Sequence, residues 1–425
     1  MFKKFLTVFI ALVLSVTLCA CTINIPVQPS TQSSSALIDT ITSIIADYSY
    51  YDVSDEELAK MVVAAYSQAV GDDYAYYYTA EEFKELNESN VGNTQGIGIS
   101  VIENTEYNCI EIMSVEPDSP ALKAGLQRGD LVVAVGVGDN SEKVSELGFD
   151  MALKKLQGVA GTLCEFTVVR GENFGDPIPF SIMREAFVSS SVLFAKSKAD
   201  SSVGIVKILQ FNLTTPTQFC DAMESLIADG CTKFVYDLRD NPGGDLASVS
   251  AVLSRFYNEG DILIRTSSSI DPEKAQKTVS YCEAVNYGGD YSTCSVKKED
   301  IAKYRNYPAA ILINGYSASA AELFTAGMKD YGLATVVGET SYGKGCMQSI
   351  IDLSYYGLKG AMKLTTSFYF PPISDNYHGV GIVPDEGCEV VLSEEAAKLN
   401  PYSLLEENQA QDNQLARALE ILKNK

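Results

Sequence analysis

The sequence predicts an α/β protein in which a helical N-terminal segment and a β-rich domain precede an α/β core. Three observations lead to this prediction. Apolar residues follow a helical spacing over residues 37–90, β-forming residues and glycine dominate residues 91–187, and strand-like runs alternate with helix-like runs over residues 188–392. A last helical segment is predicted over residues 393–425, and a chain of 425 residues is long enough for two or three domains.

The composition is that of a globular protein with an acidic charge balance. Hydrophobic residues make up 46% of the chain and charged residues 20%, which excludes a mainly disordered chain. The 32 Lys and Arg residues stand against 55 Asp and Glu residues, so the net charge of −23 disfavours binding to nucleic acid. The single histidine disfavours His-rich metal sites, and we predict neither a metal ion nor a cofactor.

The first 20 residues predict a signal peptide. Lys3 and Lys4 precede an apolar run that ends at Ala20 and is short for a membrane span. Cys21 follows a small residue, as in a bacterial lipobox, so we favour lipidation of Cys21 over ordinary cleavage after Ala20. Residues 21–36 are then a flexible tether. We expect a lipoprotein outside the cytoplasm, held on a membrane of the bacterial cell envelope.

Capping boxes mark two helix starts in residues 37–90. Ser54 precedes Glu57, and Thr79 precedes Glu82, by the spacing at which both pairs exchange hydrogen bonds with backbone N–H groups. Residues 71–73 predict a turn between these helices. Tyrosines cluster in this segment, and we favour core or interdomain contacts for them over contact with a peptide: Tyr50, Tyr51, Tyr74 and Tyr76–Tyr78.

Four apolar runs predict the strands of the core, at residues 204–209, 233–238, 309–313 and 334–338. Residues 266–306 are long and polar for a connection, and they predict a surface insertion or a lid. Eight cysteines follow Cys21 without a CxxC pair, so we expect most of them to be buried as small hydrophobic residues. If one disulfide forms, Cys282 and Cys294 are the best candidates.

Ser319 and Lys344 are candidates for nucleophilic catalysis. Ser319 follows a strand and begins an amphipathic helix, where unpaired N–H groups and the helix dipole favour a product oxyanion. A serine needs a base, and a lysine serves when burial lowers its pKa to roughly 7–8. Lys344 lies between two glycines, and Gln348 can hold its amine without adding charge. Ser319 alone would be interpreted as a helix N-cap, and Lys344 alone as a surface lysine.

Residues 116–132 resemble the signature of a PDZ domain. They read Glu-Pro-Asp-Ser-Pro-Ala-Leu-Lys-Ala-Gly-Leu-Gln-Arg-Gly-Asp-Leu-Val, and a Gly-Ile-Gly-Ile run precedes them. The resemblance implies that the loop Gly96, Ile97, Gly98 and Ile99 holds a chain-terminal carboxylate, while the adjacent sheet edge accepts the peptide as a strand. The alternative is a β-domain that serves only as a spacer.

The chain resembles the C-terminal processing, or tail-specific, proteases. Ser-Ala-Ser, an acidic residue, an Asp eleven residues after Ser319, and Gly-Lys-Gly-x-x-Gln with the Lys twenty-five residues after it match the family pattern. The resemblance implies a crotonase/ClpP-like α/β protease core with an inserted PDZ domain. It also implies roles for individual residues: Ser319 is the nucleophile, Lys344 is the general base, and Gln348 orients Lys344. It implies further that the backbone N–H groups of Ala320 and of either Gly243 or Gly244 donate to the oxyanion.

The resemblance implies protein or peptide substrates with apolar C-terminal tails, and it leaves open a homo-oligomer or a regulatory partner protein. Structural roles are expected for Asp330, for the single histidine His378, and for Cys346, which has no histidine beside it in the sequence. Two rival functions remain. One is a catalytically inactive PDZ adaptor on a protease-like scaffold, and the other is a crotonase-type acyl-CoA enzyme.

Overall fold

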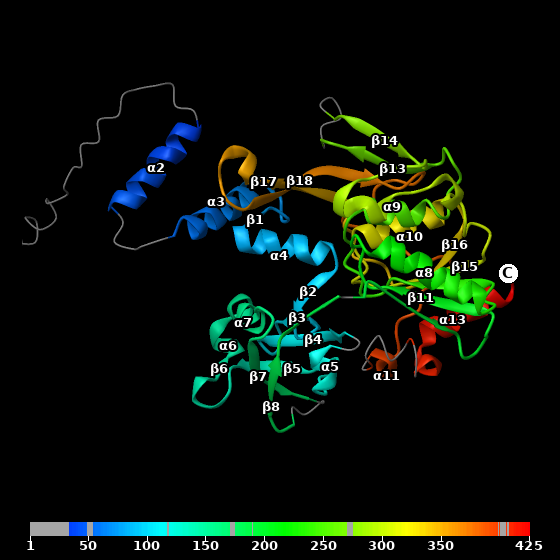
Figure 1. Cartoon of the computed structure of the whole chain (residues 1–425), viewed down its shortest axis with the longest axis horizontal. Coiled ribbons are helices and arrows are strands. Elements are labelled where there is room, and N and C mark those ends of the chain that lie inside the picture. The colour runs from blue at the N-terminus through cyan, green and yellow to red at the C-terminus, as the bar shows by residue number, and fades with distance from the viewer. Residues whose placement is uncertain are drawn as a thin grey trace, which may run out of the picture. The chain divides into compact units, whose positions relative to one another are not determined.

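The computed structural model describes residues 34–48, 54–116, 119–170, 175–188, 190–269, 275–397, 399, 405 and 408–425 (Figure 1). The predicted signal peptide and Cys21 lie outside the described residues. The described residues up to Val62 and those from Val63 onward form two compact units.

The N-terminal segment consists of α2 (Ser34–Tyr48), α3 (Asp55–Val70), β1 (Tyr76–Tyr78) and α4 (Ala80–Asn90). Both predicted capping boxes are confirmed. The Glu57 N–H donates to Ser54 Oγ at 3.2 Å and the Ser54 N–H donates to Glu57 Oε2 at 3.1 Å, and Thr79 and Glu82 exchange the same two bonds. Helix α2 begins at Ser34, ahead of the predicted boundary at residue 37.

The β-rich domain is built on an antiparallel sheet in the order β3-β4-β5-β7-β8, with β6 paired to β5. Its core holds Ile110, Val132 and Phe166 from neighbouring strands and Leu156 from a helix. Strand β3 lies at the edge of this sheet. The elements are β3 (Ile99–Asn104), β4 (Cys109–Val115), α5 (Pro120–Lys123), β5 (Leu131–Val135), β6 (Glu142–Lys143), α6 (Val144–Leu147), α7 (Phe149–Leu156), β7 (Leu163–Val169) and β8 (Ile178–Met183).

A short antiparallel pair joins the two ends of this domain to the rest of the chain. Strand β2 (Asn93–Gly96) pairs with β9 (Glu185–Val188), so residues on either side of the domain lie next to each other. The two ends of the domain therefore lie side by side, as expected for a domain that is inserted into the chain.

The core is a five-stranded sheet in the order β10-β11-β12-β15-β16, parallel except for β10. All four predicted strands are confirmed. Both faces of the sheet are covered, which explains why these strands are continuous apolar runs. The strands are β10 (Val192–Lys196), β11 (Val203–Ile208), β12 (Lys233–Asp237), β15 (Ala309–Ile313) and β16 (Ala334–Gly338).

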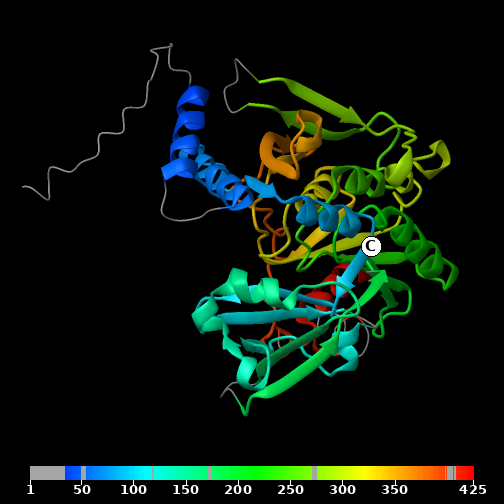
Figure 2. The same ribbon diagram turned by 60° about the vertical axis from the view of Figure 1, so that its left-hand side comes forward.

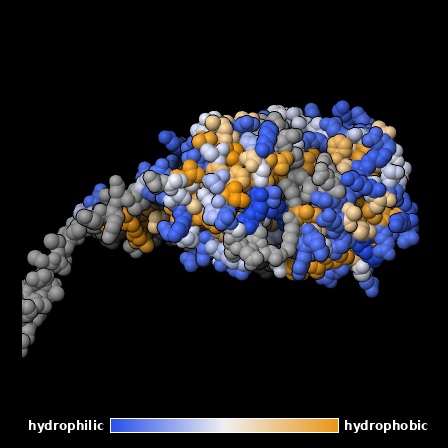
Figure 3. All heavy atoms as spheres, turned by 90° about the horizontal axis from the view of Figure 1, so that it is seen from below, coloured by the Kyte–Doolittle hydropathy of each residue, from blue (hydrophilic) through white to orange (hydrophobic). Residues whose placement is uncertain are grey.

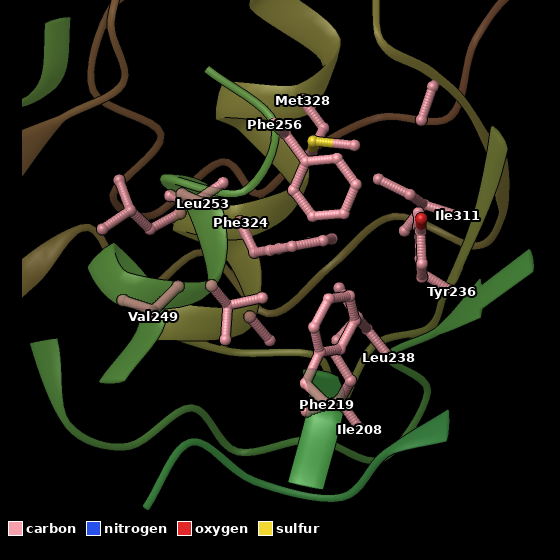
Figure 4. Packing of buried hydrophobic residues seen from close by; sticks show 14 of the residues in the cluster. Ile208, Phe219, Tyr236, Leu238, Val249, Leu253, Phe256, Ile311, Phe324 and Met328 are labelled. Atoms are coloured by element: carbon pink, nitrogen blue, oxygen red, sulfur yellow. The ribbon is translucent and has the colours of Figure 1, made fainter. Parts of the chain in front are cut away.

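Helices α8 (Thr215–Ala228), α9 (Leu246–Leu253) and α10 (Ala320–Asp330) cover one face, and α13 (Asn413–Lys423) covers the other (Figure 1). Alternate residues of β12 point to opposite faces: Tyr236 packs with Phe256 and Phe324, whereas Val235 packs with the residues of α13. Figure 4 shows the aromatic side of this core, where Phe324 of α10, Phe256 and Tyr236 contact one another, with ring centres 5.4 to 5.9 Å apart. The helix that begins at the predicted nucleophile is thereby fixed by close packing.

A second sheet centres on the long strand β18 (Ala361–Phe370), which pairs with β1, with β13 (Ile262–Ser267) and with β17 (Cys346–Asp352). Strand β14 (Lys277–Tyr281) completes it as the outer strand of a hairpin with β13 (Figure 2). The segment 266–306, predicted as a surface insertion or a lid, contains regular structure. It begins with this hairpin, and the turn that contains Cys294 packs against Leu213.

All eight described cysteines are free thiols, so the Cys282–Cys294 disulfide is wrong. Cys282 lies in the main core with its Sγ 3.7 Å from the Tyr257 carbonyl oxygen, whereas Cys294 is buried in a separate cluster with Leu213 and Ala251. The two thiols bracket a loop in sequence, but they point into different cores.

Hydrophilic and hydrophobic residues are interspersed over the face that Figure 3 shows. None of the helices in the described ranges has both the length and the apolar character that a membrane span requires.

Candidate active site

The candidate site lies where three neighbouring parallel strands end. Strand β12 leads into the turn at residues 238–244, β15 into the loop before Ser319, and β16 into the loop that carries Lys344. The carboxyl ends of parallel strands meet at one edge of a sheet, which is where open α/β folds bind their ligands. Residues that are far apart in the sequence come together here.

Ser319 is the N-cap residue of α10 and has a positive φ of 54° with ψ −116°. Such a backbone is rare for a residue with a β-carbon and occurs mainly at functional turns. The Ser319 side chain is half-buried, and its Oγ lies 3.4 Å from the Tyr369 hydroxyl oxygen. The turn thus presents the hydroxyl at the helix N-terminus, among groups that favour negative charge.

The turn after β12 approaches Ser319 closely. A β-carbon on Gly243 would lie 2.7 Å from Ser319 Cβ and 2.8 Å from the Ala320 nitrogen, so only glycine fits there. The Gly243 N–H donates to Asn241 Oδ1 at 2.8 Å. Among the described residues, the N–H groups of Gly244 and Ala320 have no acceptor. These two N–H groups are therefore available as donors, whereas the Gly243 N–H is already used.

Glu322 joins Ser319 to the loop that carries Lys344, a role that the sequence analysis missed. Its buried carboxylate accepts the N–H of Ser319 (2.8 Å) and the N–H of Lys344 (2.7 Å) on the same oxygen, Oε2. Its Oε1 accepts the Ser341 hydroxyl and the Gly343 N–H, both at 2.6 Å. Charge-assisted bonds of this kind are strong, so one side chain sets the relative position of both backbones. Glu322 lies three residues after Ser319, the same spacing as in the two predicted capping boxes. This spacing could have pointed to Glu322 in the sequence.

Lys344 extends from a loop that glycines allow to pack closely. A β-carbon on Gly345 would lie 2.6 Å from the Asn376 side chain, and one on Gly343 would lie 2.9 Å from the Gly381 nitrogen. The Lys344 Nζ lies 4.5 Å from the centre of the Tyr74 ring. Burial of the amine lowers the pKa of Lys344 below its ordinary value; Lys363 acts in the same direction, while Cys346 and Glu322 oppose it. The amine is thus in the environment that a neutral general base requires.

Gln348 lies on β17 and donates from Nε2 to Thr365 Oγ1 at 3.1 Å and to Cys346 Sγ at 3.2 Å. Within the described ranges, no hydrogen bond joins the Lys344 amine to Ser319 or to Gln348. Catalytic hydrogen bonds are often long in the free enzyme and shorten when substrate binds. The structure therefore links Ser319 and Lys344 through their backbone N–H groups, which both bind Glu322. Gln348 is held beside them by its hydrogen bonds to Cys346 and Thr365.

Two further tyrosines and the single histidine support this arrangement. The Tyr369 hydroxyl donates to the Lys344 carbonyl oxygen at 2.6 Å, and the Tyr377 hydroxyl lies 3.4 Å from the Ser319 carbonyl oxygen. The Gly345 N–H donates to His378 Nδ1 at 3.3 Å, which agrees with the structural role expected for His378. Burial raises the pKa of the Cys346 thiol, as expected for a packing residue and not for a nucleophile.

The predicted carboxylate loop of the β-rich domain precedes the edge strand β3. The carbonyl oxygens of Ile97 and Gly98 accept N–H groups from Ala121 and Glu116, which fixes the loop. Among the described residues, the N–H groups of Ile97 and Gly98 have no acceptor. The loop therefore has free donors next to an open sheet edge, the two features that capture of a C-terminal peptide requires.

Two hollows lie beside the site. One of about 410 Å³ is lined by Val101 of β3 on one side and by Pro242, Ala318 and Tyr342 on the other. A second, of about 300 Å³, lies along β18 and is lined by Tyr74, Cys346 and His378 among others. In the described part of the chain, no group of three or more His, Cys, Asp and Glu side chains is arranged to hold a metal ion.

Comparisons with known proteins agree with this geometry. The model of Peptidase family S41 matches residues 202–387, and the model of the PDZ domain matches residues 111–170. The chain is 31% identical over 329 residues to a carboxy-terminal-processing protease of Bartonella bacilliformis, across 76% of this chain and 68% of that protein. It is 31% identical over 352 residues to a CtpA-like serine protease of Staphylococcus saprophyticus, across 83% of this chain and 65% of that protein.

Among solved structures, the photosystem II D1 C-terminal processing protease matches with a TM-score of 0.53 at 20% identity, over 85% of this chain and 87% of that one. At this identity the likeness concerns the fold. Together with the matches above, it confirms the predicted α/β core with a PDZ domain.

Proposed function

Because the chain belongs to peptidase family S41, a family of serine peptidases, and carries a PDZ domain, we propose that it cleaves proteins whose C-terminal tails its PDZ domain captures. The observation that carries the proposal is the Glu322 carboxylate, whose Oε2 accepts the N–H groups of both Ser319 and Lys344. A serine and a half-buried lysine that are held in this way form a nucleophile and its base.

In the proposed reaction, neutral Lys344 takes the Ser319 proton as Oγ attacks the scissile carbonyl carbon. The negative charge on the carbonyl oxygen is received by the Ala320 N–H and by the N–H of the turn Gly243–Gly244, with Gly244 favoured because the Gly243 N–H donates to Asn241. Lys344 then gives the proton to the leaving amine, and the C–N bond breaks. Water, deprotonated by Lys344, hydrolyses the acyl-enzyme and restores the serine. Gln348 orients the amine.

Substrate capture is assigned to the loop Gly96–Ile99 and to β3. The free N–H groups of Ile97 and Gly98 receive the terminal carboxylate, and the tail adds to the sheet edge as a strand. Apolar side chains of the tail pack on the domain. The reaction requires no cofactor.

The place of action that we propose is outside the cytoplasm, on a membrane of the bacterial cell envelope. The support is the N-terminal sequence, in which an apolar run precedes Cys21. Incorporation of labelled palmitate into the full chain tests this: the label is expected in the parent and absent from Cys21→Ala. A Cys21→Ala protein that is labelled as strongly as the parent contradicts lipidation at Cys21.

The test of the activity is degradation of an unfolded protein by purified residues 22–425. We expect the parent and Lys359→Ala, an exposed lysine, to cleave, and Ser319→Ala and Lys344→Ala to be inactive while they stay folded. A Ser319→Ala protein that cleaves as fast as the parent contradicts the assignment. An inert parent that still binds a peptide with a free C-terminus, and not its C-terminal amide, would instead be the PDZ adaptor.

A further inference from the structure

A turn from the beginning of the chain lies against the candidate catalytic residues. It consists of residues Gly71–Tyr74 and follows α3, where the Gly71 and Asp72 N–H groups donate to the Ser67 carbonyl oxygen at 2.8 and 3.0 Å. Gly71 has a φ of 72°, which favours glycine. Strand β1 follows the turn and pairs with β18, with Tyr76 opposite Lys363. This pairing brings the turn next to Thr365.

Asp72 holds Thr365 with both carboxylate oxygens. Its Oδ2 accepts the Thr365 N–H at 2.9 Å, and its Oδ1 accepts the Thr365 hydroxyl at 2.7 Å and the Tyr74 N–H at 3.1 Å. Burial alone would raise the pKa of Asp72, but the hydrogen bonds from Thr365 and Tyr74, with help from Lys363, keep it below its ordinary value. The carboxylate is therefore ionised and acts only as an acceptor.

The Thr365 hydroxyl passes the effect of Asp72 on to Gln348, because it fixes which group of Gln348 can face it. A hydroxyl has a single proton, and the Thr365 proton goes to Asp72, so toward Gln348 the Thr365 oxygen acts only as an acceptor. Gln348 meets it with Nε2 at 3.1 Å. If the amide were flipped, its oxygen would face the lone pairs of Thr365. The relay from Asp72 through Thr365 therefore decides which end of the Gln348 amide remains for the lysine.

Tyr74 approaches Lys344 from the same turn. Its ring centre lies 4.5 Å from the Lys344 Nζ, and its backbone N–H is held by Asp72. The pKa of the Tyr74 hydroxyl is raised to about 12, chiefly by burial, so the ring carries no charge at neutral pH. The ring displaces water from the amine, while its π face also attracts an ammonium group. The other charged or titratable groups that act on this amine are Lys363, Cys346 and Glu322.

We propose that two residues of the turn Gly71–Tyr74 work in the catalytic site: Asp72 is a positioning residue that orients Gln348 through Thr365, and Tyr74 shields the Lys344 amine from water. The proposal rests on the proposed function, because it assigns work to Gln348 and Lys344 in the service of Ser319. A segment that precedes the PDZ domain thus takes part in the chemistry.

The relay is tested in residues 22–425 with a short peptide substrate. Asp72→Asn and Thr365→Val are each expected to lower kcat at least about tenfold with little change in KM, because the base loses its orienter while substrate binding is kept. Thr365→Ser keeps the hydroxyl and is expected to recover most of kcat. Asp73→Asn, one residue away and exposed, is the control with unchanged activity. Equal kcat in Asp72→Asn, Thr365→Val and Asp73→Asn would overturn the relay.

The shielding is tested by the pH dependence of kcat/KM. Tyr74→Ala admits water to the amine, so the pKa of Lys344 rises and the acid limb of the profile moves to higher pH. Tyr74→Phe keeps the ring, so its acid limb is expected close to that of the parent. A Tyr74→Ala profile that coincides with the parent's, at whatever absolute rate, would overturn this role. An inert parent, by contrast, contradicts the proposed function. In that case the relay is tested by the thermal shift of Thr365→Val against Thr365→Ser, and equal melting temperatures would overturn it.

Discussion

Ser319 adopts backbone angles that cost free energy for any residue with a β-carbon. At φ 54° and ψ −116° the strain is on the order of 1–3 kcal/mol. Close packing of α10, in which Phe324 is fully buried among other aromatic rings, holds the turn in place. The strained conformation places the Ser319 hydroxyl at the start of the helix. Its position therefore costs the protein some of its free energy of unfolding.

Because of this strain, we expect two variants that both lack the hydroxyl to differ in stability. Both Ser319→Ala and Ser319→Gly remove the hydroxyl, but only glycine adopts the positive φ freely. We expect Ser319→Gly to be more stable than Ser319→Ala by about 1 kcal/mol after the extra chain entropy of glycine is subtracted. Urea unfolding of the two proteins measures the difference. Greater stability of the alanine variant would mean that the turn is not strained.

The buried amine of Lys344 makes stability depend on pH in a defined direction. Its pKa is lower in the folded state than in the unfolded chain, so the unfolded chain binds the proton more tightly between the two values. The free energy of unfolding therefore rises with pH through that window, which ends near the ordinary pKa of 10.5. Lys344→Met removes this rise and is more stable than the parent below the window. Unfolding of both proteins from pH 6 to pH 10.5 checks it, and parallel curves would contradict it.

Ser319 and Lys344 could be proposed as nucleophile and base from the sequence because both lie within one short stretch. Glu322 could have been found from its capping-box spacing to Ser319. Tyr74 and Asp72 could not be assigned, because their contacts depend on the pairing of β1 with β18. The sequence favoured core or interdomain contacts for Tyr74, whereas the structure places its ring against the Lys344 amine. A local sequence pattern cannot predict that β1 pairs with a strand nearly 290 residues later.

At the scale of elements, Glu322 fastens the start of α10 to the loop after β16. Glu322→Gln keeps the size but replaces one acceptor oxygen with an amide donor that faces N–H groups. We expect a loss of about 2–4 kcal/mol in the free energy of unfolding and at least about a hundredfold loss of kcat. Denaturation and steady-state kinetics measure both. A variant that loses stability without losing kcat would limit Glu322 to a structural role.

Helix α13 is joined to the core by a buried ion network. Asp412 caps the helix through the Leu415 N–H and accepts both Nη1 (3.0 Å) and Nη2 (2.7 Å) of Arg239, which also binds Asp237. Burial opposes the charge of Asp237, yet Arg239 and Lys207 hold the pKa of this carboxylate far below its usual range. Arg239 begins the turn that approaches Ser319, so this network connects the C-terminal helix with the site.

Removal of Asp412 leaves two buried cations, Arg239 and Lys207, with a single carboxylate, Asp237, between them. We expect Asp412→Ala to cost about 3–5 kcal/mol. Glu420→Ala breaks only the exposed pair with Arg417 and is expected to leave the free energy of unfolding almost unchanged. Asp412→Asn keeps the helix cap and is expected to fall between them. Chemical denaturation of the three variants orders them, and equal losses for Asp412→Ala and Glu420→Ala would contradict the network.

At the scale of the whole molecule, the net charge of −23 acts on every approaching substrate. Basic unfolded peptides are attracted and acidic ones are repelled over distances that salt screens. We expect added salt from about 20 mM to 300 mM to raise KM for a basic peptide and to lower it for an acidic peptide of the same cleavage sequence. Initial rates measure this, and a KM that moves in the same direction for both would contradict electrostatic steering.

Much of the fold could be predicted because covered parallel strands are continuous apolar runs, as in Ala309–Ile313. The hairpin within residues 266–306 could not. Every residue of β14 is exposed, so neither alternation nor hydrophobicity marks it as a strand. The pairing of Cys282 with Cys294 failed for a related reason, because proximity in sequence does not reveal into which core a side chain points.

The bond from the Asp72 carboxylate to Thr365 has a consequence for the order of events during biosynthesis. Its partners are 293 residues apart, so the turn is synthesised long before the strand that it contacts. Closing so long a loop comes late in folding, after the intervening domains have formed. Until then the lysine lacks its shield and the glutamine its orientation. A chain assembled in this way reaches its full activity only after the intervening domains have folded, when less of it is exposed as a substrate for its own site.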